Sequence, residues 1–162
     1  MNNITRLFDF PYYQLEKYNL PDALVTKYGN EWVKTSTKEY LDKANSISRG
    51  MLRLGVNKND KIALISSNNR TEWNICDIGI LQTGAQTVPI YPTITAEDYE
   101  YILNHSEAKY CFISDAEVFE KINSIKKNVS SLIEIYSYND IDSCKSWNEI
   151  LELGKDSSNQ NE

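Results

Sequence analysis

The chain has 162 residues, with 17 basic and 23 acidic side chains and a formal net charge of −6. This acidic balance and the lack of any run of Lys and Arg argue against a general nucleic-acid surface. The length suffices for one domain, and the sequence predicts neither a secretory signal nor a membrane span.

The N-terminal part predicts a short helix followed by a hairpin. Residues 4–18 have apolar side chains at helical spacing that Pro11 interrupts, so we expect a helix that breaks or begins there. Two alternating runs, residues 23–28 and 31–36, then flank Gly29-Asn30. Short alternating runs around a pair that contains glycine are typical of a β-hairpin.

The clearest local signal is a capping box at Ser36-x-x-Glu39, in which the two side chains satisfy backbone N–H groups at the start of a helix. Gly55 supplies the C-terminal stop. The apolar positions of this amphipathic helix follow at three- to four-residue spacing and are Tyr40, Leu41, Ala44, Ile47, Met51, Leu52 and Leu54.

From residue 61 onward, strand-like and helix-like segments alternate. The strand-like runs are residues 61–66, 86–91, 109–114 and 132–136. The helix-like segments are residues 70–84, 95–105 and 115–127, and a second capping box, Ser146-x-x-Glu149, opens a short helix that stops at Gly154. This alternation predicts an α/β fold, in which a mainly parallel sheet has helices on both faces and the N-terminal β-hairpin is added to it.

Two glycine spacings imitate a phosphate-binding loop. Gly50 to Gly55 and Gly79 to Gly84 both have the Gly-x-x-x-x-Gly spacing, but neither continues with Lys-Ser/Thr and both fall within or at the end of predicted helices. No Gly-x-Gly-x-x-Gly and no Gly-x-Ser-x-Gly occurs. The sequence therefore predicts no catalytic residue in this chain.

The cysteines and the single histidine predict no metal site. The three cysteines do not form a disulfide framework, because their number is odd. They are Cys76, Cys111 and Cys144, and each lies in an apolar stretch, which indicates small buried hydrophobes in a reducing compartment. His105 alone cannot complete a usual Cys/His zinc site. We interpret it as a residue at the end of a helix, where a partial positive charge is favourable.

The stretch from residue 81 to 93 is the most specific segment of the sequence. Pro89 removes one ladder donor from the strand at 86–91, which suits an edge strand or a strand with an unusual neighbour. Tyr91, Pro92 and Thr93 follow at its carboxyl end, where ligands bind in open α/β sheets, and we predict that they support a substrate site. A helix cap and turn device is an alternative that the same residues allow.

At these residues the chain resembles the N-terminal part of the adenylate-forming acyl-CoA synthetases, in their long-chain fatty acid–CoA ligase branch. The resemblance is collinear from about residue 32 to 114, and its Tyr91-Pro92-Thr93 ending points to the long-chain branch. One departure is Asn59-Asp60, where the family commonly has Gly-Asp, and Asn tolerates a left-handed turn. The matching pieces are Trp32, Lys34-Thr35, Glu39-Tyr40, Leu54-Gly-Val, Asn59-Asp-Lys-Ile-Ala-Leu, Asn68, Glu72-Trp73, Thr83-Gly-Ala, Val88-Pro-Ile-Tyr-Pro-Thr and Tyr101-Ile-Leu-Asn-His-Ser-Glu-Ala-Lys.

The resemblance implies a two-step reaction. A carboxylate attacks the α-phosphate of ATP to give an acyl-adenylate and pyrophosphate, and the thiol of CoA then displaces AMP. The family's phosphate loop, adenine and ribose motifs and C-terminal domain with its catalytic Lys do not appear in this chain. We therefore expect an N-terminal fragment that is inactive alone and needs no cofactor, whereas ATP, Mg and CoA serve the full-length parent.

The expected domain organisation is residues 1–155 as the N-terminal segment of the large AMP-binding domain, followed by a polar disordered tail over 156–162. The parent's partners would be fatty acid, ATP and CoA, in the cytoplasm or at the periphery of a membrane, and the fragment could self-associate through an exposed face or strand edge. Two alternatives are a free-standing α/β binding or regulatory module and an adenylate-forming ligase for another carboxylic acid.

Overall fold

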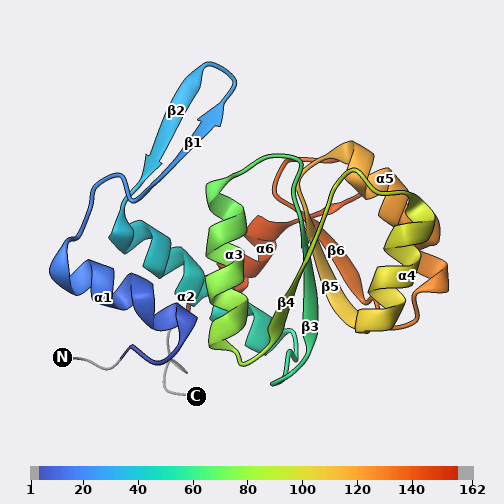
Figure 1. Cartoon of the computed structure of the whole chain (residues 1–162), viewed down its shortest axis with the longest axis horizontal. Coiled ribbons are helices and arrows are strands. Elements are labelled where there is room, and N and C mark those ends of the chain that lie inside the picture. The colour runs from blue at the N-terminus through green and yellow to red at the C-terminus, as the bar shows by residue number, and fades with distance from the viewer. Residues whose placement is uncertain (1–3, 157–162) are drawn as a thin grey trace.

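The centre of the molecule is a five-stranded parallel sheet with the strand order β4-β3-β5-β6-β7 (Figure 1). The structure is a computed structural model in which residues 4–156 are described. The strands are β3 (Lys61–Ile65), β4 (Gln86–Ile90), β5 (Ala108–Ile113), β6 (Glu134–Ser137) and β7 (Lys145–Ser146). The predicted parallel sheet is confirmed, and β7 is a short strand that the sequence did not predict.

Alternating side chains of the central strands fill two separate cores, one on each face of the sheet. On β3, Ile62 and Leu64 belong to one core and Ala63 and Ile65 to the other. Because successive side chains of a strand point to opposite faces, a continuous apolar run places hydrophobic groups on both. The sheet is therefore buried on both sides, as the apolar run at 61–66 predicted.

Helices cover both faces of the sheet, as expected. The helices α2 (Thr37–Arg53), α3 (Thr71–Gln82) and α6 (Trp147–Leu153) supply one core, and α4 (Ala96–Ser106) and α5 (Ala116–Ile125) supply the other (Figure 1). A 3₁₀ turn (Lys126–Asn128) follows α5. A second 3₁₀ turn (Leu7–Asp9) precedes α1 (Phe10–Lys17), which contacts α2 and begins with Pro11 in its first turn.

Helix α2 is anchored at both ends. Ser36 and Glu39 form the predicted capping box at its start, and Gly55 follows its end with a φ of +82°. Leu52, which the helical spacing assigned to the buried face, is instead 42% exposed. It lies in the last turn of α2, next to Arg53.

Two glycines allow helices to approach α2 closely. A Cβ atom on Gly79 of α3 would lie 2.7 Å from the carbonyl oxygen of Ala44, and one on Gly154 would overlap the carbonyl oxygen of Ser46. The Arg49 guanidinium donates a 2.6 Å hydrogen bond to the Gly154 carbonyl, so α2 also contacts the residue that ends α6. Gly154 ends α6 with an ordinary negative φ, which makes close packing the reason for glycine at this position.

The hairpin consists of β1 (Leu24–Tyr28) and β2 (Glu31–Thr35) and projects away from the sheet (Figure 1). Gly29 has a φ of +59° and is the first of the two turn residues, which is where a type II′ hairpin turn places glycine. The predicted hairpin is therefore confirmed, and its residues pair from Leu24 with Thr35 to Tyr28 with Glu31.

Pro89 lies on the open side of strand β4, which is at the edge of the described sheet. The Gln86 N–H donates to the Asp60 carbonyl at 2.8 Å. Because backbone groups alternate along a strand, the N–H and C=O groups of residues 86, 88 and 90 point toward β3. The backbone groups of Thr87 and Pro89 consequently point to the free edge of the sheet. The missing N–H of Pro89 costs no ladder bond, and the predicted edge position is confirmed.

Candidate functional site

The candidate site is the edge of the sheet at which the parallel strands end. The segments that follow β3, β4, β5 and β6 all emerge there because the four strands run in the same direction. Strand order reverses around β3, since β4 lies on one side of it and β5 on the other. Such a switch point is where open α/β sheets bind ligands.

Two serines and an aspartate connect the ends of β3 and β5. The Ser67 N–H donates to Ser114 Oγ at 2.9 Å, and both hydroxyls donate to Asp115 Oδ2 at 2.6 Å. Asp115 Oδ1 accepts the Val118 N–H at 3.1 Å and so caps α5. Burial raises the pKa of Asp115, but the hydrogen bonds from Ser114, Ser67 and the backbone outweigh it and lower the pKa.

A buried ion pair lies in the segment that follows β3 and contacts the hairpin. The Arg70 guanidinium bonds both oxygens of Glu72, at 2.7 and 3.0 Å, and also bonds Asn139 Oδ1 at 3.1 Å. The Tyr28 hydroxyl donates to Glu72 Oε2 at 2.7 Å. The side chains of Arg70 and Glu72 are 4% and 13% exposed. The rings of Tyr28 and Tyr138 lie 5.8 and 5.0 Å from the guanidinium carbon.

The hairpin also supplies the cap of helix α3. Arg70 occupies the N-cap position but its side chain makes no capping bond. Instead, Thr26 Oγ1 accepts the Thr71 N–H at 2.9 Å and lies 2.8 Å from the Thr71 hydroxyl. We call the five residues Thr26, Tyr28, Arg70, Thr71 and Glu72 the hairpin clasp. Its contacts are satisfied within the chain, so the clasp fixes the hairpin at the carboxyl edge of the sheet.

Sequence reasoning treated Glu72 only as part of a family pattern and did not anticipate the hairpin clasp. The available signal was an arginine directly before a helix that has no capping side chain of its own. Such a helix start needs an acceptor from elsewhere in the chain. The partner could not be identified from spacing alone, because Thr26 is 45 residues earlier.

The predicted substrate-site residues lie at the end of the edge strand. Tyr91 is 80% exposed, and its carbonyl oxygen accepts the Tyr99 hydroxyl at 3.0 Å. Pro92 and Thr93 follow before the capping box of Thr95 and Asp98, which opens α4. The structure thus places Tyr91, Pro92 and Thr93 at the carboxyl edge, at the start of the connection to α4.

Two of the three cysteines and the glycine pairs have the structural roles that the sequence predicted, whereas Cys144 is only partly buried. Cys76 and Cys111 are fully buried, one in each core, and burial raises the pKa of both thiols. Gly50 and Gly79 lie inside helices against neighbouring backbone. Within residues 4–156, no group of three or more His, Cys, Asp or Glu side chains could hold a metal ion, and no helix is long and apolar enough to cross a membrane.

Comparison with known proteins gives matches over most of the chain. A family model described as AMP-binding enzyme matches residues 14–161. A long-chain-fatty-acid–CoA ligase of Xenopus laevis is 29% identical over 147 residues, which are 88% of this chain and 20% of that protein. One from Mycobacterium bovis is 32% identical over 104 residues, which are 64% of this chain and 17% of that protein. The chain thus spans about a fifth of the length of these curated relatives.

Solved structures show the same fold. A long-chain-fatty-acid–CoA ligase from Archaeoglobus fulgidus superimposes with a TM-score of 0.76 at 19% identity, covering 93% of this chain and 30% of that chain. An anthranilate CoA ligase in complex with anthranoyl-AMP also gives a TM-score of 0.76, at 21% identity, covering 91% and 27%. At these identities the structures establish the fold alone.

Proposed function

Because the chain belongs to the AMP-binding enzyme family, we propose that residues 1–155 form the N-terminal segment of the large AMP-binding domain of a long-chain fatty acid–CoA ligase. The observation that carries this proposal is the family match over residues 14–161, combined with curated relatives named as such ligases. The parent converts ATP, a fatty acid and CoA to acyl-CoA, AMP and pyrophosphate through an acyl-adenylate.

We expect this segment on its own to hold no cofactor. No metal-binding group occurs among residues 4–156, and the two pairs of glycines pack helices or follow their ends. We therefore derive no chemical step on this chain and assign ATP, Mg and CoA to the remaining parts of the parent. The role of this segment is that of a scaffold whose carboxyl edge faces the active centre.

Within that scaffold, Tyr91, Pro92 and Thr93 support the acyl or nucleotide site. Their place at the carboxyl end of β4 supports this role, since ligands of open α/β sheets bind outside the carboxyl ends of the strands. The Tyr99 hydroxyl fixes the backbone at Tyr91 through a 3.0 Å bond, and the Tyr91 side chain is left exposed. An exposed aromatic ring on a fixed backbone is suited to contact another part of the parent.

An exchange assay tests the scaffold role. Incubated with palmitate, ATP and labelled pyrophosphate, the 162-residue chain is expected to give no ATP–pyrophosphate exchange, with a full-length long-chain ligase as the positive control. Exchange by this chain alone would contradict the proposal. Reading the coding DNA beyond Glu162 gives a second test. An open frame that enters a Ser/Thr/Gly-rich loop with a Lys supports the ligase, and an immediate stop codon supports a free-standing module.

The same proposal places the parent in the cytoplasm, at the surface of the membrane that supplies its acyl substrate. Cell fractionation followed by washing with high salt tests this placement. A peripheral enzyme is released from the membrane fraction by salt, whereas an integral one is retained.

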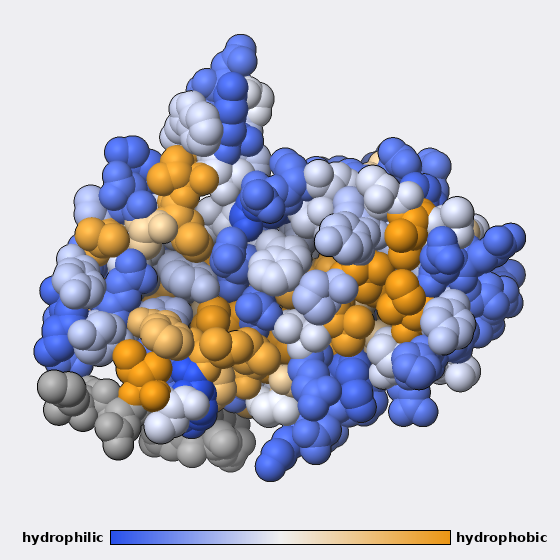
Figure 2. All heavy atoms as spheres, viewed as in Figure 1, coloured by the Kyte–Doolittle hydropathy of each residue, from blue (hydrophilic) through white to orange (hydrophobic). Residues whose placement is uncertain are grey.

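The isolated chain is expected to self-associate through exposed hydrophobic side chains. Figure 2 shows hydrophobic groups over the N-terminal helical segment, where Leu7 and Phe10 are 66% and 54% exposed. Trp32 on the hairpin is 65% exposed. Contiguous exposed apolar surface favours association. Sedimentation velocity at increasing concentration is expected to show species larger than a monomer, and a clean monomer at high concentration would overturn this expectation.

A further inference from the structure

The N-terminal hairpin has an outer face on which every side chain is exposed. Residues that pair across antiparallel strands point to the same side of a hairpin. The register pairs Lys27 with Trp32 and Val25 with Lys34, and these four exposed residues form the outer face. The opposite face carries Thr26 of the hairpin clasp, which bonds α3. The outer face therefore points away from the rest of the chain.

Large hydrophobic side chains of the hairpin are exposed to water. Trp32 and Val25 on the outer face are 65% and 44% exposed, and neither belongs to either hydrophobic core. Tyr28 and Val33 on the opposite face are 39% and 45% exposed. Apolar area that stays in water gains no burial energy from folding of the chain. The hairpin thus offers apolar surface that a partner can cover.

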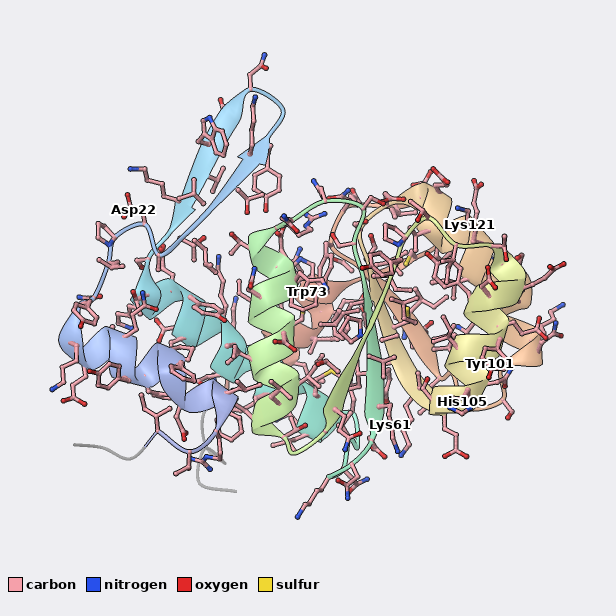
Figure 3. The ribbon with its side chains drawn as sticks, in the orientation of Figure 1. Asp22, Lys61, Trp73, Tyr101, His105 and Lys121 are labelled. Atoms are coloured by element: carbon pink, nitrogen blue, oxygen red, sulfur yellow. The ribbon has the colours of Figure 1, made fainter. Side chains whose placement is uncertain are left out.

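The outer face is cationic, although the whole chain has a net charge of −6. It carries Lys27 and Lys34 and no carboxylate. The Lys27 Nζ atom lies 5.7 Å from the centre of the Trp32 ring, and among the ion pairs of residues 4–156 none includes Lys27. Lys34 bonds Asp22 at the base of the hairpin at 3.2 Å, and both side chains of this pair are exposed (Figure 3). The charge of the face is complementary to an anionic partner.

The shape of the hairpin and its side chains favour a flat partner with an apolar layer below its charges. The hairpin projects beyond the sheet and the helices (Figure 1), so an extended surface can reach it without meeting the rest of the molecule. Tryptophan is enriched where lipid meets water, because its ring is apolar and its N–H is polar. A lysine there places its apolar stem along the lipid and its ammonium group among the headgroups. A bilayer that contains anionic lipid has both properties.

From this geometry we propose that the outer face of the hairpin binds the surface of an anionic lipid bilayer. The Trp32 ring enters the headgroup region, and Lys27 and Lys34 contact anionic headgroups. The hairpin clasp fixes the hairpin at the carboxyl edge of the sheet, so this contact brings that edge toward the membrane. The proposal rests on the membrane placement proposed above for the parent, and it names the surface that makes the contact.

Co-sedimentation of the full 162-residue chain with lipid vesicles tests this surface. One set of vesicles contains phosphatidylcholine alone and the other a mixture with phosphatidylserine, at pH 7 and low ionic strength, since salt screens exposed charges. The chain is expected to bind the mixed vesicles about 5-fold or more tightly than the others, and high salt is expected to remove this preference. Because anionic lipid repels a chain of net charge −6, such a preference requires a local cationic surface.

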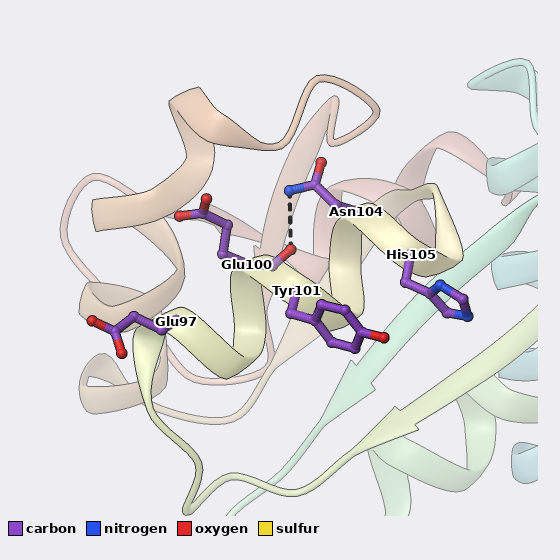
Figure 4. A pocket seen from close by; sticks show the side chains of 5 residues that line it. All are labelled: Glu97, Glu100, Tyr101, Asn104 and His105. Atoms are coloured by element: carbon purple, nitrogen blue, oxygen red, sulfur yellow. Dashed lines mark hydrogen bonds between the residues drawn. The ribbon is translucent and has the colours of Figure 1, made fainter.

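Matched variants assign the binding to the outer face of the hairpin. Lys27→Gln is expected to weaken binding to the mixed vesicles about 5-fold, and Lys127→Gln, at an exposed site after α5, is its control. Trp32→Ser is expected to weaken binding about 10-fold, because the apolar area of the ring is lost. Tyr101→Ser is its control, at a site 68% exposed on α4 and far from the hairpin (Figures 3 and 4). Thermal unfolding of each variant verifies that it folds.

Tryptophan fluorescence locates the contact within the chain. Brominated lipid quenches the emission of a tryptophan that enters the bilayer. Quenching is expected in the original chain and is expected to be absent from the folded Trp32→Phe variant, in which Trp73 and Trp147 remain. Quenching that persists in this variant would assign the contact to another surface.

Three further results would overturn the proposal. The first is equal binding to both kinds of vesicle, or binding to neither. The second is unchanged binding in the folded Lys27→Gln and Trp32→Ser variants. The third is self-association that Trp32→Ser removes while the original chain ignores vesicles, since the face would then bind a second copy. Vesicle binding tests the hairpin alone, whereas the exchange assay and the reading frame test the proposed ligase, so the two failures are distinguishable.

Discussion

The central sheet and the N-terminal hairpin are stabilised by different kinds of interaction. In the sheet, β3 and β5 bury nearly every side chain between two hydrophobic cores. In the hairpin, four of the five residues of β2 are exposed, and the polar groups of the hairpin clasp provide its attachment. The difference teaches that one element of a fold can be stabilised by buried apolar surface and another by a few polar groups that bond each other. Elements held in the second way can open without global unfolding.

The largest expected effect is that of a large cavity in the sheet core. Phe112 on β5 is fully buried, and its ring lies 5.8 and 6.1 Å from those of Tyr136 and Tyr138. Phe112→Ala is expected to lower the free energy of unfolding by about 3–5 kcal/mol, measured by urea denaturation. Leu52→Ala at an exposed site is the control and is expected to change it by less than about 1 kcal/mol. Similar losses in both variants would contradict the assigned core.

A smaller and more local effect is expected from breaking the buried ion pair. Arg70→Met leaves the Glu72 carboxylate buried without its cation and is expected to cost about 3 kcal/mol. Hydrogen exchange is expected to accelerate at β1 and β2 amides while β5 amides change least. The double variant Arg70→Met/Glu72→Gln is expected to recover part of the loss, because no uncompensated charge remains. Equal acceleration in the hairpin and the sheet would show that the two regions open together.

Removing the helix cap supplied by the hairpin is expected to have a milder effect. Thr26→Val keeps the shape of the side chain but removes the acceptor of the Thr71 N–H. The expected cost is about 1–2 kcal/mol, seen as faster exchange at the first turn of α3. Val25→Thr, at an exposed position of the same strand, is the control and is expected to lie within about 0.5 kcal/mol of the original chain.

Acidification is expected to cause the smallest of these losses in the stability of the hairpin. Burial raises the pKa of Glu72, but hydrogen bonds from Arg70 and Tyr28 outweigh it and hold the pKa below its ordinary value of 4.5. The unfolded chain therefore binds the proton first, so the stabilisation is complete above about pH 4.5 and is lost as pH falls through the folded pKa. The protection factors of β1 amides, which correct the exchange rates for intrinsic pH dependence, should fall below pH 4.5, and Glu72→Gln should flatten this dependence. A pH-independent hairpin in the original chain would contradict the role of Glu72.

Apolar periodicity and capping boxes were sufficient to predict the sheet, its covering helices and the hairpin. Ser36 and Ser146 each begin a helix where the capping box placed it, and Thr95 is the cap of the helix predicted at residues 95–105. These features are local, since each depends on residues a few positions apart. Pro89 was equally informative because a missing N–H excludes a central strand position.

The contacts that connect distant segments could not be predicted. The Thr26–Thr71 and Arg49–Gly154 pairs join residues far apart in sequence, and neither has a local pattern. Glu107 ends α4 in the left-handed region, at φ +54°, where a glycine signal would have been expected. The stacking of the Tyr101 and His105 rings on α4 was also missed, because His105 was considered as a helix end and Tyr101 as part of a family pattern.

The contact between α2 and α6 has a consequence for synthesis on the ribosome. The groove of α2 that receives Gly154 is complete once Arg53 has been made, but its partner arrives about 100 residues later. At a translation rate of about 5–20 residues per second, that surface stays uncovered for about 5–20 s. During this interval the nascent helix is a site at which a chaperone can bind, and Gly154 is the residue whose arrival ends that access.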